Sequence, residues 1–162
     1  MSDTYLCRFL RSTIGLKVVM ALTGIVLSGF VAAHLAGNLL LFAGPEKFDA
    51  YAHMLKANPA VLWGARLTLL ASVVAHAVAA VILTRRSRAD ARPVPYAVKG
   101  SHGSTYAART MIFGGPILAL FVVYHLLHFT VGTVHPKFDA AQPYANVIIG
   151  FGSAPVVLVY LI

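Results

Sequence analysis

The sequence predicts an all-α membrane protein, a transmembrane helical bundle, on two observations. Apolar residues make up 59% of the 162 residues and charged residues 11%, whereas roughly 25% are charged in an ordinary soluble domain. The apolar residues also gather in long runs that lack the period-2 alternation of membrane barrel strands, so helices are the structure expected to cross the lipid. A soluble enzyme is a poor interpretation, because a soluble chain needs more polar surface.

Three of the apolar runs are long enough to cross the hydrocarbon core, which takes about 20 helical residues. They extend from about Leu16 to Phe42, from about Val61 to Thr84, and from about Met111 to Val134. A fourth run begins near Asn146 and is still apolar at Ile162. We therefore expect three full spans and a fourth helix inside which the chain is truncated, with residues 1–162 forming a single domain.

The charges indicate an orientation. The net charge of +8 comes from 13 Lys and Arg against 5 Asp and Glu. Eight of the cations fall on one side of the predicted membrane: Arg8, Arg11, Arg85, Arg86, Arg88, Arg92, Lys99 and Arg109. The other side has Lys47, Lys56 and Lys137. The positive-inside rule places the N-terminus and the 85–110 loop in the cytoplasm, and this explanation of the charge leaves no reason to expect a nucleic-acid partner.

Four of the seven histidines lie inside the predicted spans: His34, His76, His125 and His128. Ionisable groups in spans are costly and usually functional. At about 1.5 Å per helical residue, His34 lies ~27 Å from the cytoplasmic end of its span, His125 ~21 Å, His128 ~26 Å and His76 ~12 Å. Two histidines at one depth on different helices can ligate one haem b iron from opposite faces. The depths pair His34 with either His125 or His128 and leave His76 alone; the alternative is that each histidine is merely hydrogen-bonded.

Cations near the membrane surfaces are candidates to pair with haem propionates. Arg66, Arg109 and Lys17 are the three we select. Arg66 is the best of them, because a guanidinium inside a span is costly unless an anion pairs with it. The alternative is that Arg66 extends to the outer headgroups. The single cysteine, Cys7, excludes an internal disulfide and a cysteine-based zinc or iron–sulfur site.

Three segments carry a resemblance to a known family. They read R-S-T-I-G-L-K-V-V-M-A-L-T-G at 11–24, A-H-L-A-G-N-L-L-L-F-A-G-P-E-K-F-D-A-Y-A-H at 33–53, and R-T-M-I-F-G-G-P-I-L-A-L-F-V-V-Y-H-L-L-H-F at 109–129. The chain resembles the cytochrome b membrane-anchor subunit of succinate dehydrogenase/fumarate reductase, of the single-anchor, five-helix, di-haem type. The resemblance covers essentially the whole chain.

The resemblance implies two b haems held by four histidines, one on each of the first four helices. His34 and His125 match the ligands of the distal haem, and His76 matches one ligand of the proximal haem. The choice of His125 over His128 rests on the resemblance. The fourth ligand and the fifth helix of the family are expected beyond Ile162, so one haem is fully ligated within residues 1–162.

The implied function is electron transfer within an enzyme complex of the tricarboxylic acid cycle. A flavoprotein subunit would interconvert succinate and fumarate, an iron–sulfur subunit would relay electrons, and this chain would pass them to menaquinone or another quinone. The chain itself has no flavin or dicarboxylate site. The resemblance implies the bacterial cytoplasmic (inner) membrane and a quinone site on its outer side, where His53 and Lys56 are candidates. Imidazole exchanges a proton near neutral pH.

Three alternatives stay open. The chain could be a haem-poor or haem-free anchor that docks the same catalytic subunits. It could be a histidine-based proton channel or transporter, although the spans contain no carboxylate and no Gly/Pro-broken helix pair. It could also be a free-standing di-haem ferric reductase. The number of haems bound, together with co-purification of a dehydrogenase, separates these alternatives.

Overall fold

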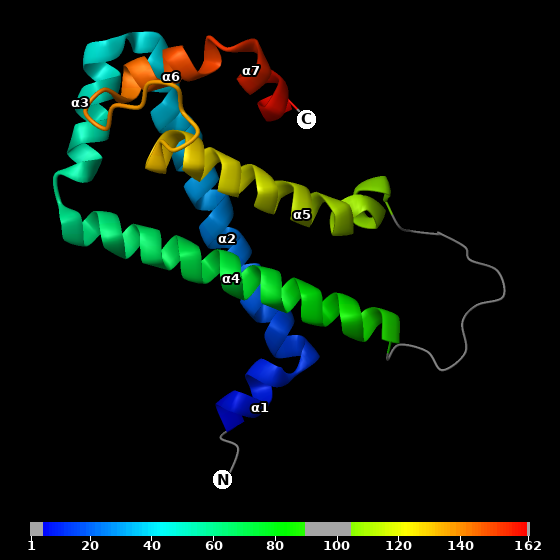
Figure 1. The fold of residues 1–162 in the computed structure, drawn as a ribbon. Helices are drawn as coiled ribbons and strands as arrows, with labels where there is room; N and C mark the ends of the chain where they lie inside the picture. Colours follow the sequence, from blue (N-terminus) through cyan, green and yellow to red (C-terminus); the bar gives the residue numbers. More distant parts are fainter. Residues whose placement is uncertain (1–4, 90–104, 162) are drawn as a thin grey trace. The chain divides into compact units, whose positions relative to one another are not determined.

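The computed structural model describes residues 5–89 and 105–161, and the regular structure within these ranges is entirely helical (Figure 1). The segment 90–104, which carries much of the predicted cytoplasmic loop, lies outside the described residues. The elements are α1 (Tyr5–Arg11), α2 (Thr13–Asn38), a 3-10 turn η1 (Leu39–Ala43), α3 (Pro45–Lys56), α4 (Pro59–Ala89), α5 (Tyr106–Leu126), a π-helical turn η2 (Leu127–Val131), α6 (Pro143–Phe151) and α7 (Ala154–Leu161).

Three helical segments are long and apolar enough to cross a membrane: Thr13–Ala43, Pro59–Ser87 and Arg109–Val131. They coincide with the three predicted runs, so the all-helical fold with three membrane-length helices is confirmed. The first two segments extend slightly past their apolar runs at both ends, since a polar end can stay helical where water or headgroups surround it. The third begins at Arg109, before its run, but ends at Val131, before Val134, because Gly132 takes a positive φ of 84°.

The chain divides into two compact units. Unit 1 comprises Met1–Ala36 and Asn58–Gly100, and therefore contains α1, most of α2, and α4. Unit 2 comprises Gly37–Ala57 and Ser101–Ile162, and contains η1, α3, α5, η2, α6 and α7. The assignment of residues 1–162 to one functional domain stays a prediction.

In unit 1 a serine separates α1 from α2. The Ser12 hydroxyl donates to the Phe9 carbonyl at 2.7 Å and accepts the Gly15 N–H at 2.9 Å, which caps the start of α2. A Cβ on Gly15 would collide with the same carbonyl, so the tight joint requires glycine. Figure 1 shows α2 crossing α4. Near the end of α4, the Arg86 guanidinium donates to the carbonyl of Arg11, the last residue of α1, at 2.9 Å.

In unit 2 the helix α3 packs on α6. The Asp49 carboxylate accepts the Tyr144 N–H at 2.8 Å, so an anion from α3 caps the beginning of α6. Phe48 is buried, and its ring meets the Tyr144 ring edge-on with centroids 6.2 Å apart. Gly44 enters α3 with φ of 98°, a conformation that favours glycine.

The fourth apolar run, for which the sequence predicts one helix, forms two helices. It begins at Pro143 and breaks after Phe151, and α7 continues at 89° to α6. The break has a local cause, because Pro155 lacks an N–H and its ring would clash with the Phe151 carbonyl in a continuous helix. The bent pair is a broken span or a re-entrant loop by its length and composition. The expectation that the spans contain no Gly/Pro-broken helix pair is therefore wrong for this segment.

Candidate functional site

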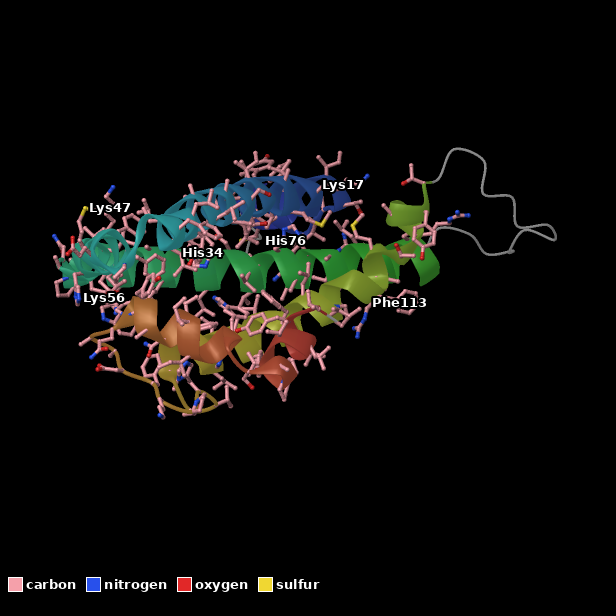
Figure 2. The ribbon with its side chains drawn as sticks, turned by 90° about the horizontal axis from the view of Figure 1, so that it is seen from above. Lys17, His34, Lys47, Lys56, His76 and Phe113 are labelled. Atoms are coloured by element: carbon pink, nitrogen blue, oxygen red, sulfur yellow. The ribbon has the colours of Figure 1, made fainter. Side chains whose placement is uncertain are left out.

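His76 lies on α4 in unit 1, where that helix meets α2 (Figure 2). Its imidazole Nδ1 is 3.0 Å from the Thr23 hydroxyl oxygen. The same hydroxyl oxygen is 2.7 Å from the Val19 carbonyl oxygen, one turn earlier on α2. His76 is therefore tied to the neighbouring helix through one ring nitrogen.

The Thr23 hydroxyl has three neighbours within hydrogen-bond distance. Its oxygen is 2.7 Å from the Val19 carbonyl oxygen and 3.2 Å from the Met20 carbonyl oxygen, and a carbonyl oxygen can only accept. A hydroxyl that donates to a carbonyl accepts the Nδ1–H of His76, whereas a hydroxyl that donates to Nδ1 requires the other tautomer. The 2.7 Å separation is the ordinary length of an O–H···O bond and favours the first arrangement.

Small residues surround this histidine. Ser72 and Ala79 are buried at 8% and 1% exposure and share the face of α4 that carries His76. On α2, a Cβ placed on Gly24 would lie 3.5 Å from Cε1 of the ring, an ordinary contact distance. Small side chains let helices approach closely, and His76 itself is half-buried.

His34 and His125 share a local arrangement, each within its own unit. His34 on α2 is exposed, and the Phe30 ring is stacked on it with centroids 5.3 Å apart. His125 on α5 is half-buried, and the Phe121 ring is stacked on it with centroids 5.8 Å apart. In both cases the phenylalanine precedes the histidine by four residues, which places the two rings on one helix face and restricts the imidazole.

His128, the alternative to His125, lies in a different environment. It is 0% exposed, and its Nδ1 is 3.2 Å from the Tyr160 hydroxyl. The rings of Phe129 and His135 pack on it with centroids 4.2 and 5.0 Å away. Its Nε2 is buried with no hydrogen-bond partner in the described part of the chain. The His128 ring is thus enclosed by its neighbours, and the choice of His125 over His128 as a haem ligand stays a prediction.

His135, which the sequence does not single out as a site residue, has a hydrogen-bond partner at both ring nitrogens. Its Nε2–H donates to the Asn146 carbonyl at 2.9 Å, and its Nδ1 accepts the Lys137 N–H at 3.1 Å. The Asn146 amide in turn binds both backbone groups of Asp139, at 2.6 and 3.0 Å. The sequence alone does not distinguish this histidine from a metal ligand, because its hydrogen bonds depend on how the 132–142 loop folds.

The three propionate candidates are exposed cations. Lys17 lies near the beginning of α2 (Figure 2), and Arg109 near the beginning of α5. The Arg66 guanidinium lies 5.1 Å from the ring centroid of Trp63 on the same helix, a cation–π contact. Arg66 thus has an aromatic neighbour that sequence spacing alone, three residues apart, could have indicated. Pairing of these cations with propionates stays a prediction.

The two quinone candidates are exposed side chains near the end of α3 in unit 2. The Lys56 ammonium donates to the Ala140 carbonyl at 3.0 Å, which ties α3 to the loop before α6. His53 lies one turn earlier on the same helix. A role for either in quinone binding stays a prediction.

Comparisons of the chain with protein-family models, with curated proteins and with solved structures found no match. Within residues 5–89 and 105–161, no three His, Cys, Asp or Glu side chains come together as possible ligands of one metal ion. A bis-histidine haem centre needs two imidazoles and no such cluster.

Proposed function

We propose that the chain is the haem b-containing membrane anchor of a succinate:quinone oxidoreductase. The observation that carries the proposal is His76, a histidine in a membrane-length apolar helix whose Nδ1 lies 3.0 Å from the Thr23 hydroxyl oxygen. A hydrogen bond from Nδ1–H to that oxygen would direct the Nε2 lone pair to a metal. Metal-ligating histidines typically have this arrangement, in which the second ring nitrogen donates to an acceptor. The sequence resemblance at 11–24, 33–53 and 109–129 supplies the identity of the complex.

In this proposal His34 and His125 ligate one haem, and His76 supplies one ligand of a second. Haem b supplies a one-electron carrier when bound. The chain's own residues do the rest: Phe30 and Phe121 restrict the imidazoles stacked on them, and the apolar helices exclude water. The exposed cations Arg66, Arg109 and Lys17 would pair with the propionates.

The partners follow from the same proposal. A flavoprotein subunit and an iron–sulfur subunit would carry the dicarboxylate chemistry on the cytoplasmic side, where the basic residues gather. Electrons would pass through this chain to menaquinone or another quinone, with His53 and Lys56 near the quinone on the opposite side. The complex would lie in a bacterial cytoplasmic membrane.

The test is purification of the tagged chain from the membranes of its source organism in mild detergent. The proposal predicts that a flavin-containing and an iron–sulfur subunit co-purify, and that the preparation reduces a quinone with succinate as electron donor. A haem-containing chain without dehydrogenase partners would point to the ferric reductase. Co-purifying dehydrogenase subunits without haem would leave the docking anchor as the better function.

A further inference from the structure

We propose that Thr23 is the positioning residue for His76: its hydroxyl accepts the Nδ1–H of the imidazole and so presents Nε2, with its lone pair, to a haem iron. The part of this inference that concerns iron rests on the proposed function. The part that concerns the tautomer rests on the distances from the Thr23 hydroxyl oxygen: 3.0 Å to Nδ1, 2.7 Å to the Val19 carbonyl oxygen and 3.2 Å to the Met20 carbonyl oxygen.

The arrangement also orients the ring. Thr23 is β-branched, so few χ1 rotamers are open to it in a helix, and its bond back to Val19 selects one of them. The acceptor for His76 is therefore held in place by α2 and does not reorient with solvent. Ser72 and Ala79 on the same face of α4 are small, so the helices approach closely enough for the 3.0 Å bond.

Two effects on a bound haem follow. A hydrogen bond accepted from Nδ1–H raises the basicity of the ligating nitrogen, which strengthens ligation. It also favours the more positively charged ferric iron, so the bond lowers the reduction potential of that haem. Loss of the hydroxyl is expected to weaken haem binding at His76 about 10- to 100-fold, the usual effect of removing such a partner, and to raise the potential.

The chain offers matched variants. Thr23→Val removes the hydroxyl and keeps the shape, and Thr23→Ser keeps the hydroxyl. Thr110→Val is the control at another position, because the Thr110 hydroxyl makes the same kind of bond back to the Tyr106 carbonyl, at 3.1 Å on α5. Any general effect of replacing a helical threonine by valine appears in that control.

The first readout is the ¹⁵N spectrum of histidine-labelled chain in detergent, without added haem, with the His76 signals assigned by their loss in His76→Gln. We expect a protonated Nδ1 and an unprotonated Nε2 in the wild type, in Thr23→Ser and in Thr110→Val. Thr23→Val is expected to lose this preference. An unchanged His76 tautomer in Thr23→Val, or the opposite tautomer in the wild type, overturns the inference.

The second readout is hemin titration with a redox titration of the bound haem. It is made in a His34→Ala background, with His76→Ala in the same background as the zero. Weaker binding and a raised potential in Thr23→Val, restored in Thr23→Ser, support the inference. Equal affinity and potential in Thr23→Val and Thr110→Val overturn its iron part. If the wild-type chain binds no haem, the proposed function fails, and the ¹⁵N spectrum still decides the hydrogen bond.

Discussion

His76 in unit 1 and His128 in unit 2 each have Nδ1 within hydrogen-bond distance of a hydroxyl, in contrasting surroundings. Each places Nδ1 beside a hydroxyl of a neighbouring helix, Thr23 at 3.0 Å and Tyr160 at 3.2 Å. His76 is half-buried beside the small residues of α2 and α4, whereas His128 is 0% exposed among aromatic rings. In the proposed function, a ring nitrogen without a hydrogen-bond partner ligates haem only where the volume around it admits a flat cofactor.

The largest expected effect is the loss of one haem, which tests whether His125 or the enclosed His128 is a ligand. His125→Ala is expected to abolish the haem that His34 and His125 share, because a bis-histidine iron loses one of its two protein ligands. His128→Phe is expected to keep full haem content, since His128 is packed on all sides. The measurement is haem content per chain by pyridine haemochrome; the opposite pattern would make His128 the ligand.

The next effect is on stability at His128. A Cβ at Gly150 would lie 2.9 Å from Cε1 of His128 and 3.2 Å from the Phe129 ring. Neither ring can move freely in a packed cluster, so Gly150→Ala is expected to cost about 1–3 kcal/mol, as overpacking usually does. Thermal unfolding in detergent measures it, and an unchanged midpoint would show that the cluster has room.

A smaller effect is expected at Tyr160. Tyr160→Phe removes the hydroxyl from His128 Nδ1 and should lower stability by about 1 kcal/mol, the usual net value of one such bond. Haem content should not change, in contrast to Thr23→Val, which should weaken haem binding. The unfolding midpoint and the haem affinity are measured for both variants. If Tyr160→Phe and Thr23→Val change haem affinity equally, His76 and His128 do not differ as the proposal requires.

The smallest effect is expected beside His76. A Cβ at Gly24 meets Cε1 of the ring at 3.5 Å, an ordinary contact. Gly24→Ala should therefore be neutral or stabilising by up to about 1 kcal/mol, because alanine is the better helix former. A clear loss of stability in the unfolding assay would mean that the contact between α2 and α4 around His76 is as tightly packed as the aromatic rings around His128.

The sequence predicted the helices well because span length and apolar composition are properties of one segment at a time. The bend after Phe151 was missed, although Pro155 and the neighbouring Gly152 signal a break in an otherwise apolar run. The stacked Phe30 and Phe121 were also missed, and their spacing of four residues from a histidine could have indicated them.

The contacts between segments could not be predicted in the same way. The position of His76 along its helix predicts its depth in the membrane. Depth does not say which residue of a crossing helix faces the imidazole, so the contact with Thr23 could not be predicted from the sequence. Depth likewise left His125 and His128 as alternatives. The difference between them is the packing of η2 against α6 and α7, which pairs residues distant in sequence.

The most direct test of the central claim is the haem content of the purified full chain, from a dithionite-reduced minus oxidised spectrum with a pyridine haemochrome assay. The proposal predicts a b-type α band and haem bound to the wild-type chain. The haem that His34 and His125 share should be lost in His34→Ala and in His125→Ala and retained in His128→Phe. A wild-type chain from native membranes that carries no haem would contradict the ligand roles of His34, His76 and His125.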